Sequence, residues 1–225
     1  MTLNLVIAES ALEVIPNEIR RSSAVVNDAK RRERDPSKIL LDRSIHHAAM
    51  AGLKEDYKRG RPDIVHVVLL SVCGTPLYGD SILKVYVHTR SDVVMEVGEK
   101  TRLPKNYFRF RNLMEKLLSE KKSSDLIKVY DGSIRELVRK VLKPDLVVGL
   151  STEGESRALE VLAKELVEKK SPCVVIGGFP HGHFSESTLG VLDGLVRIHQ
   201  RALDAHVVAS RLVYEVERAS RGKNQ

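Results

Sequence analysis

The last third of the sequence alternates between short apolar runs and segments whose apolar residues are spaced three and four apart. Residues 145–150 and 172–176 are two such runs of strand length, and residues 159–167 between them have the helical spacing. Parallel strands need a crossover connection, usually a helix, so this order predicts neighbouring parallel strands. The sequence therefore predicts an α/β fold in which a parallel sheet is flanked by helices.

Further elements are expected before this unit. Residues 3–7 have the composition of a strand, and residues 83–88 and 93–97 have that of a strand pair or hairpin. Residues 10–34 carry apolar residues at helix-compatible spacing and end in a basic run, which predicts a helix from about Ser10. The chain is thus expected to begin with a strand that can join the same sheet, followed by a helix.

The segment after Gly194 has the clearest amphipathic pattern in the chain. Its apolar residues recur at spacings of three and four from Leu195 to Val216. This spacing predicts a long final helix.

A glycine-rich loop follows the second apolar run, with the sequence Gly177-Gly178-Phe179-Pro180-His181-Gly182. Gly177 and Gly182 can adopt positive φ and place no Cβ between their peptide groups and a ligand. Loops at the carboxyl ends of parallel strands bind small molecules in open α/β sheets, although a plain strand-to-helix turn can contain the same glycines. Neither this loop nor residues 149–151, which follow the preceding strand, resembles a Gly-Lys-Ser/Thr phosphate loop or GxGxxG. A ligand other than a nucleoside triphosphate or dinucleotide is therefore expected.

The charge of the chain suits a nucleic-acid partner. The 225 residues include 37 Lys and Arg against 30 Asp and Glu, a formal net charge of +7. Only 4% of the residues are aromatic and none is Trp, which argues against a platform that stacks several successive bases. A bound RNA is therefore expected to be held through its phosphates, with one or a few captured bases.

Neither a membrane nor an oxidising compartment is indicated. No apolar run reaches the roughly 18 residues that cross a bilayer. The two cysteines, Cys73 and Cys173, each lie in an apolar run, as buried thiols of a reducing compartment do. The sequence predicts a cytoplasmic protein without a membrane partner.

Two groups of charged residues suggest binding functions. In Arg61-Pro62-Asp63, proline starts a helix and the carboxylate can orient the guanidinium, although a solvated arginine at a helix start is the commoner case. A second group places four cations within ten residues, and these could clamp phosphates or form a solvated surface: Arg102, Lys105, Arg109 and Arg111.

Metal and serine chemistry find little support. His181-x-His183 with Cys173, or the pair His46-His47, could hold zinc, but no CxxC, HExxH or spaced carboxylate set accompanies them. No GxSxG elbow is present either. The sequence therefore predicts no metal site and no serine nucleophile.

Taken together, the motifs resemble the Nep1/Emg1 ribosome-biogenesis proteins, and more specifically their archaeal members, because no polar N-terminal extension is present. The resemblance runs over nearly the whole chain and rests on five motifs in family order: residues 3–12, 41–47, 61–66, 102–105 with 108–110, and 177–182.

The resemblance implies a single SPOUT-class methyltransferase domain over residues 1–225, with a C-terminal trefoil knot and an insertion at approximately residues 36–60. It also implies a homodimer that uses S-adenosylmethionine to methylate N1 of a pseudouridine in small-subunit rRNA. Such a protein acts in small-subunit biogenesis, where ribosomal proteins or other assembly factors are further candidate partners.

The resemblance also implies site residues. Leu150, Gly177 and Gly182 match family positions that contact the cofactor. A third cofactor loop falls on Leu195, Val196, Arg197, Ile198, His199 and Gln200, where only Gly194-Leu195 matches well; this would delay the start of the final helix. The RNA-contacting positions are Arg61, Arg102, Lys105 and Arg109, with a lysine at 105 in place of the family's arginine.

The expected catalytic pair is Arg61 and Asp63. Arg61, held by Asp63, would stabilise the charge that develops on the ring as N1 loses its proton, and direct proton removal by Asp63 is the alternative. The alternative function is a non-catalytic rRNA-binding assembly factor whose cofactor pocket is only structural. A metal-dependent RNA hydrolase is a more distant third.

Overall fold

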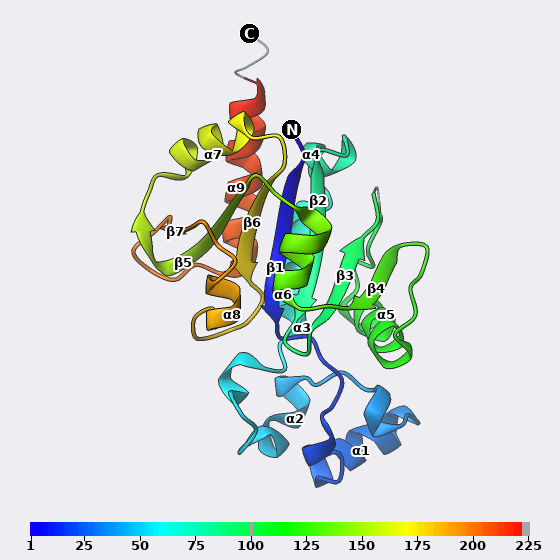
Figure 1. Ribbon diagram of the computed structural model, residues 1–225. Helices are drawn as coiled ribbons and strands as arrows, with labels where there is room; N and C mark the ends of the chain where they lie inside the picture. Colours follow the sequence, from blue (N-terminus) through cyan, green and yellow to red (C-terminus); the bar gives the residue numbers. More distant parts are fainter. Residues whose placement is uncertain (100, 222–225) are drawn as a thin grey trace.

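A computed structural model describes residues 1–99 and 101–221. Within these residues one sheet of seven strands runs through the protein in the order β4-β3-β2-β1-β6-β5-β7 (Figure 1). The strands are β1 (Leu3–Ser10), β2 (Leu83–Thr89), β3 (Val93–Val97), β4 (Ile127–Asp131), β5 (Leu146–Ser156), β6 (Pro172–Gly177) and β7 (Gly194–Arg197).

The strand directions confirm the predicted α/β class. β1 pairs in parallel with β2 and β6, and β5 pairs in parallel with β6 and β7. β3 runs antiparallel to both β2 and β4, which confirms the predicted pairing of residues 83–88 with 93–97. The carboxyl ends of β1, β6 and β5 therefore meet at one edge of the sheet.

Helices cover both faces of this sheet. In Figure 1, α3 and α9 lie behind the sheet with α7 beside α9, and α6 with its continuation η4 lies in front. The helices are α1 (Ser23–Arg32), α2 (Arg43–Met50), α3 (Pro62–Val72), α4 (Pro76–Gly79), α5 (Tyr107–Glu120), α6 (Ile134–Glu136), the π-helix η4 (Leu137–Leu142), α7 (Leu159–Glu168), α8 (Glu186–Leu189) and α9 (Ala205–Arg221).

The alternation of side chains along β1 explains why the sheet is buried on both sides. Leu5 and Ile7 belong to the apolar cluster that includes α3 and α9, whereas Val6 and Ala8 belong to the cluster under α6 and η4. Successive strand residues point to opposite faces, so a continuous apolar run supplies two cores.

A small lobe lies below the sheet in Figure 1 and is formed by residues 11–61, including α1 and α2. It has its own apolar core, in which Ile15, Ile39 and Met50 are buried. The prediction of a helix from about Ser10 is wrong for its first half, because the Ile15 N–H donates to the Ile39 carbonyl at 2.9 Å. This bond and Pro16, which has no N–H, prevent a helical hydrogen-bond ladder there. The insertion at residues 36–60 falls within this lobe and stays a prediction.

Two boundaries differ from the sequence-based expectation in the last third. Leu195 and Val196 lie in strand β7, opposite Gly149 and Leu150, so the predicted helix begins only at Ala205. The later start agrees with the family resemblance. Residues 149–151 lie inside β5, because that strand pairs with β7 again at Glu155 after a register shift. The trefoil knot stays a prediction.

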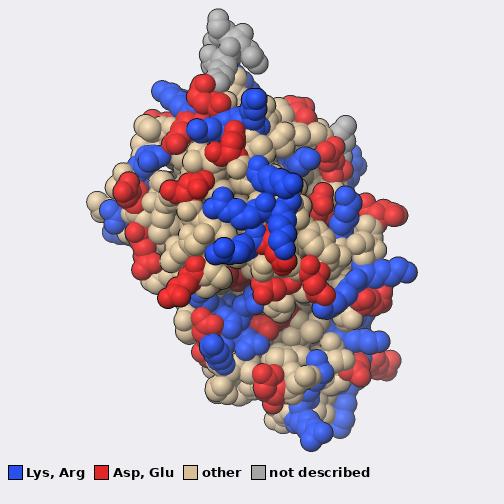
Figure 2. Space-filling model, in the orientation of Figure 1, with Lys and Arg blue, Asp and Glu red and all other residues tan. Residues whose placement is uncertain are grey.

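Lys and Arg gather on the face shown in Figure 2 over α6 and η4 and over the lower lobe. The exposed basic residues of α6 and η4 are Arg135, Arg139 and Lys140.

None of the helices described is both long and apolar enough to cross a membrane.

Candidate active site

A cavity opens at the carboxyl edge of the sheet, where β5 and β6 end their pairing. Its walls come from three parts of the chain that are distant in sequence: the end of β5, the loop after β6, and the segment from β7 to the first turn of α9. The lining residues are Leu150, Ser151, Thr152, Gly177, Phe179, Pro180, His181, Gly182, His183, Phe184, Ile198, His199, Arg201, Ala202, Leu203 and Val208.

Five of the residues predicted to bind a cofactor line this cavity: Leu150, Gly177, Gly182, Ile198 and His199. Leu195 and Val196 face another hollow beside β5, together with Glu153 and Arg157. Arg197 ends β7, and Gln200 lies in the loop between β7 and α9. The structure thus brings together Leu150, the two glycines, and two residues of the predicted third cofactor loop, Ile198 and His199.

Sequence reasoning missed the apolar side of the cavity. Phe179 and Phe184 lie on the glycine loop, with their rings edge to face at a centroid distance of 6.0 Å. Leu203 comes from the loop just before α9, and Val208 comes from the start of α9. The two aromatic residues can be seen in the sequence around the loop. Leu203, in contrast, fell inside the final helix as it was expected from the spacing, so it was not expected to line a loop.

A second cavity adjoins the first. The two share Phe179, Pro180, His181, Ala202 and Leu203 as lining residues. The far side of the second cavity is formed by α3 and the start of α9: Arg61, Asp63, Ile64, Val67, Asp204, Ala205 and His206. A shared wall means that groups bound in the two cavities would meet across the Phe179–His181 segment and the start of α9.

Arg61 and Asp63 form the charged rim of the second cavity. Pro62 occupies the first position of α3, which fixes its φ and leaves Arg61 at the helix boundary. Arg61 donates from Nε to Oδ1 of Asp63 at 2.8 Å and from Nη2 to Oδ2 at 2.7 Å. This bond raises the pKa of Arg61 further above its ordinary value, and partial burial opposes the rise. The guanidinium is therefore charged and fixed in orientation.

The basic segment before α5 is attached to α3, the helix that Arg61 precedes. His66 of α3 lies with Nε2 2.8 Å from the Pro104 carbonyl, and its ring stacks on Phe110 at 4.3 Å. Asn106 begins α5 by accepting the Arg109 N–H at 3.1 Å. The predicted RNA-binding residues on this segment and on the first turn of α5 are all exposed: Arg102, Lys105 and Arg109.

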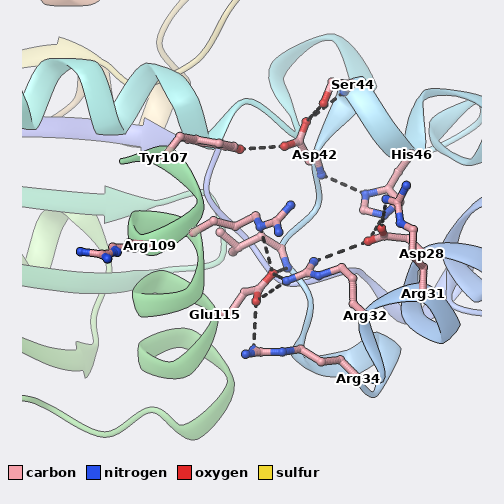
Figure 3. Close-up of polar contacts among 12 residues, drawn as sticks. Asp28, Arg31, Arg32, Arg34, Asp42, Ser44, His46, Tyr107, Arg109 and Glu115 are labelled. Atoms are coloured by element: carbon pink, nitrogen blue, oxygen red, sulfur yellow. Dashed lines mark hydrogen bonds and ion pairs between the residues drawn. The ribbon is translucent and has the colours of Figure 1, made fainter. Parts of the chain in front are cut away.

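A buried polar network joins α5 to the small lobe (Figure 3). The Glu115 carboxylate, fully buried, accepts hydrogen bonds from Arg32 at 2.6 Å and from Arg34 at 3.1 Å. At the start of α5, the Tyr107 hydroxyl donates to Asp42 at 2.7 Å. In Figure 3, Arg109 points away from this network, so the network holds the helix while leaving that cation for a partner.

The histidines and cysteines of the described chain do not gather into a metal site: no three His, Cys, Asp or Glu side chains in residues 1–99 and 101–221 come together as ligands. His183 instead faces Glu153, with Nδ1 3.2 Å from Oε2. Burial raises the pKa of the Cys173 thiol to about 12. This cysteine is therefore protonated and apolar in its behaviour.

The fold and cavities define an α/β protein with a cavity at the carboxyl edge of a largely parallel sheet, beside an arginine-bearing second cavity. The family model described as EMG1/NEP1 methyltransferase matches residues 5–217. This chain therefore belongs to the EMG1/NEP1 methyltransferase family, and the resemblance found in its motifs is confirmed.

Individual relatives cover nearly the full length. Proteins named ribosomal RNA small subunit methyltransferase Nep1 are 39% identical in Pyrococcus furiosus, over 96% of each chain, and 37% identical in Staphylothermus marinus, over 96% of this chain and 95% of the relative. The crystal structure of Archaeoglobus fulgidus Nep1 bound to S-adenosylhomocysteine has a TM-score of 0.87 and 39% sequence identity. It covers 98% of this chain and 100% of that chain.

Proposed function

We propose that this protein transfers a methyl group from S-adenosylmethionine to N1 of a pseudouridine in small-subunit rRNA, as part of small-subunit biogenesis. The observation that carries the proposal is the pair of cavities with a common wall, one lined by the glycine loop and the other by Arg61 and Asp63. Methyl transfer needs donor and acceptor side by side, and this arrangement supplies two adjoining sites. The relatives named as ribosomal RNA small subunit methyltransferases support methylation of small-subunit rRNA.

The first cavity fits the donor. Phe179, Leu203 and Val208 give it an apolar wall suited to an adenine ring, and the glycine loop exposes main-chain groups that can pair with polar edges. When bound, S-adenosylmethionine supplies a methyl group already activated by its sulfonium. The proposed donor-binding residues are Leu150, Gly177, Gly182, Leu195, Val196, Arg197, Ile198, His199 and Gln200, of which Leu150, Gly177, Gly182, Ile198 and His199 line this cavity.

Arg61 and Asp63 would act on the acceptor base in the second cavity. The N1 proton must leave as the methyl group arrives, and the ring gains negative charge before it is neutralised. Arg61 is placed to stabilise that charge, with Asp63 as the group that orients it. Because both oxygens of Asp63 already accept from Arg61, we favour the orienting role for Asp63, and the N1 proton would pass to water at this half-exposed rim.

The RNA would be held by cations near α3 and α5, namely the partly exposed Arg61 and the exposed Arg102, Lys105 and Arg109. We further propose a homodimer in the cytoplasm, with ribosomal proteins or other assembly factors as additional partners, from the family resemblance. The division into one domain of residues 1–225 with an insertion near 36–60 belongs to the same proposal. Sedimentation of the purified protein tests the dimer.

Mass spectrometry of a short rRNA hairpin tests the reaction. A hairpin with one pseudouridine is incubated with the protein and donor and compared with an identical hairpin that has uridine at that position. Uridine N1 is bonded to the sugar and cannot be methylated, so it is the matched control. We expect one added methyl group, about 14 mass units, on the pseudouridine hairpin alone, as an activated donor aligned with one acceptor nitrogen requires.

Calorimetry with S-adenosylhomocysteine separates the alternatives. Binding of both ligand and hairpin without methylation would overturn the N1 chemistry but keep the two sites. Binding of the hairpin with no binding of S-adenosylhomocysteine at high micromolar concentration would instead establish the non-catalytic assembly factor.

A further inference from the structure

A buried carboxylate lies beneath the loop that forms the first cavity. Glu9, at the end of β1, is 7% exposed and has a left-handed backbone with φ 50°. Its Oε1 accepts the Ser185 N–H at 2.7 Å, the Ser185 hydroxyl at 2.8 Å and the Thr188 hydroxyl at 2.7 Å. Glu9 therefore fixes the downstream end of the glycine loop to the sheet.

Lys58 reaches the same carboxylate from the small lobe. Its ammonium donates to Oε2 of Glu9 at 3.0 Å and to the main-chain carbonyl of His183, and it lies 4.5 Å from the centre of the Phe179 ring. Lys58 is only 4% exposed. A lysine is rarely buried unless its charge is satisfied, so this set of partners specifies where the ammonium sits. Phe179 and His183 both line the first cavity.

Gly182 shows how closely the lobe approaches this loop. Its φ is +95°, and a Cβ there would lie 2.9 Å from Cε2 of Tyr57 and 3.0 Å from Cε of Lys58. A side chain at this positive φ would be strained, and it would also displace Tyr57 and Lys58, so glycine favours the close approach of the lobe here. The lobe is thus a direct support of the loop.

The Glu9 carboxylate is charged at neutral pH. Burial by itself would raise the pKa of Glu9, but the hydrogen bonds from Ser185, Thr188 and Lys58 lower it below its ordinary value. The pair therefore acts as a charge-assisted contact rather than a neutral one.

We propose that Lys58 is a positioning residue for the methyl donor, which fixes the Phe179–His183 wall of the donor cavity from the small lobe. The inference rests on the proposed function of that cavity. Arg59, the next residue, pairs with Glu13 at 2.6 Å, and the Arg61 N–H donates to the Ala11 carbonyl at 3.2 Å. The segment that carries Lys58 leads within three residues to the arginine of the second cavity.

Lys58→Met tests this role, because methionine keeps the apolar stem but removes the three donors. Titration of S-adenosylhomocysteine should show an affinity weaker by about tenfold, as the loss of hydrogen bonds to charged groups leads one to expect. In steady-state methylation the KM for the donor should rise by a similar factor while kcat changes by less than about twofold. If Lys58 had only a structural role, its substitution would lower the melting temperature without raising the donor KM relative to kcat.

Arg59→Met is the matched control. It removes a buried ion pair from the same segment, but Arg59 bonds Glu13 and the Lys54 carbonyl rather than the loop. Its S-adenosylhomocysteine affinity should equal that of the unaltered protein. If Lys58→Met does not fold, the double variant Lys58→Met with Glu9→Gln removes both charges and keeps an acceptor for Ser185 and Thr188; it should show the same weakened affinity.

The outcomes distinguish this proposal from the proposed function. Unaltered protein that fails to bind S-adenosylhomocysteine would overturn the donor site itself. Normal binding by both the unaltered protein and the Lys58 variants would overturn only the positioning role. Equal weakening in Arg59→Met would also overturn it, because the effect would then come from general loosening of the lobe.

Discussion

Arg61 and Asp63, two residues apart across the start of α3, are joined by two parallel hydrogen bonds of 2.8 and 2.7 Å. Both side chains remain close to half exposed, at 41% and 44%, so the pair faces solvent at the rim of the second cavity. A surface ion pair contributes little to folding stability. What the geometry provides is a guanidinium of fixed orientation beside the proposed acceptor site.

Arg61→Lys should slow methyl transfer while leaving donor binding unchanged. Lysine keeps the charge, but it cannot form the two-point bond to Asp63, so its ammonium is not held in one orientation. We expect single-turnover methylation of the pseudouridine hairpin to fall at least about tenfold, in line with the loss of a positioned electrostatic contact. Calorimetry with S-adenosylhomocysteine serves as the control. An unchanged single-turnover rate would rule out Arg61 as a catalytic residue.

Glu115→Gln should destabilise the whole protein. The carboxylate is fully buried and accepts from Arg32, Arg34 and the Leu40 N–H, so the neutral amide would remove the short 2.6 Å ion pair of the largely buried Arg32 and leave it only the longer contact with Asp28 at 3.5 Å (Figure 3). Breaking a buried ion pair in this way costs about 3–5 kcal/mol. Urea denaturation measures the free energy of unfolding, and Glu120→Gln, an exposed position on the same helix, should change it by less than about 0.5 kcal/mol. Similar effects of the two substitutions would show that the network contributes no stability.

The sheet was readable from the sequence because strands buried on both faces must be apolar throughout. The runs at 146–150 and 172–176 have no exposed face that could carry polar residues, so their composition leaves few alternatives. The start of α3 was equally clear, since Pro62 fits only the first turn of a helix. Local chemistry determined these elements, and tertiary contacts then agreed with it.

Elements that depend on distant partners could not be read in this way. Leu195 begins a helical spacing of apolar residues, but the pairing of β7 with β5 makes residues 194–197 an edge strand. Lys58 lies in a polar stretch and looks like a surface residue, since its partner Glu9 is 49 positions away. Gly177 and Gly182, which we propose bind the cofactor, were found from motifs, whereas the ion pair beneath them became visible only in three dimensions.

Stability should fall as the pH drops below the ordinary pKa of histidine. Burial lowers the pKa of His46 below its usual value, and the nearby carboxylates of Asp28 and Asp42 only partly oppose this. The unfolded chain therefore binds the proton first, so stability is fully present above about pH 6.5 and decreases as the pH falls through the folded pKa. Burial also lowers the pKa of His88, so His88 contributes to the pH dependence of stability with the same sign.

His46→Gln isolates the share of His46 in this effect. The free energy of unfolding, measured in urea at pH 7.5 and 5.5, should fall less in His46→Gln than in the unaltered protein, because one of the buried titrating groups is gone. His47→Gln is the control, since His47 is the exposed neighbour on the same helix, and it should keep the full pH dependence. Identical pH dependence in all three proteins would exclude His46 as a source.

Arg109→Gln should weaken RNA binding through its phosphate contact. Arg109 is exposed on the first turn of α5 and points away from the network that anchors that helix (Figure 3). If it neutralises one phosphate of a single-stranded segment, its loss should reduce the slope of log K against log salt by about 0.7. The slope is obtained from hairpin titrations between low and moderate salt. Lys116→Gln, an exposed cation further along α5, should leave the slope unchanged, and an unchanged slope in Arg109→Gln would remove this residue from the RNA interface.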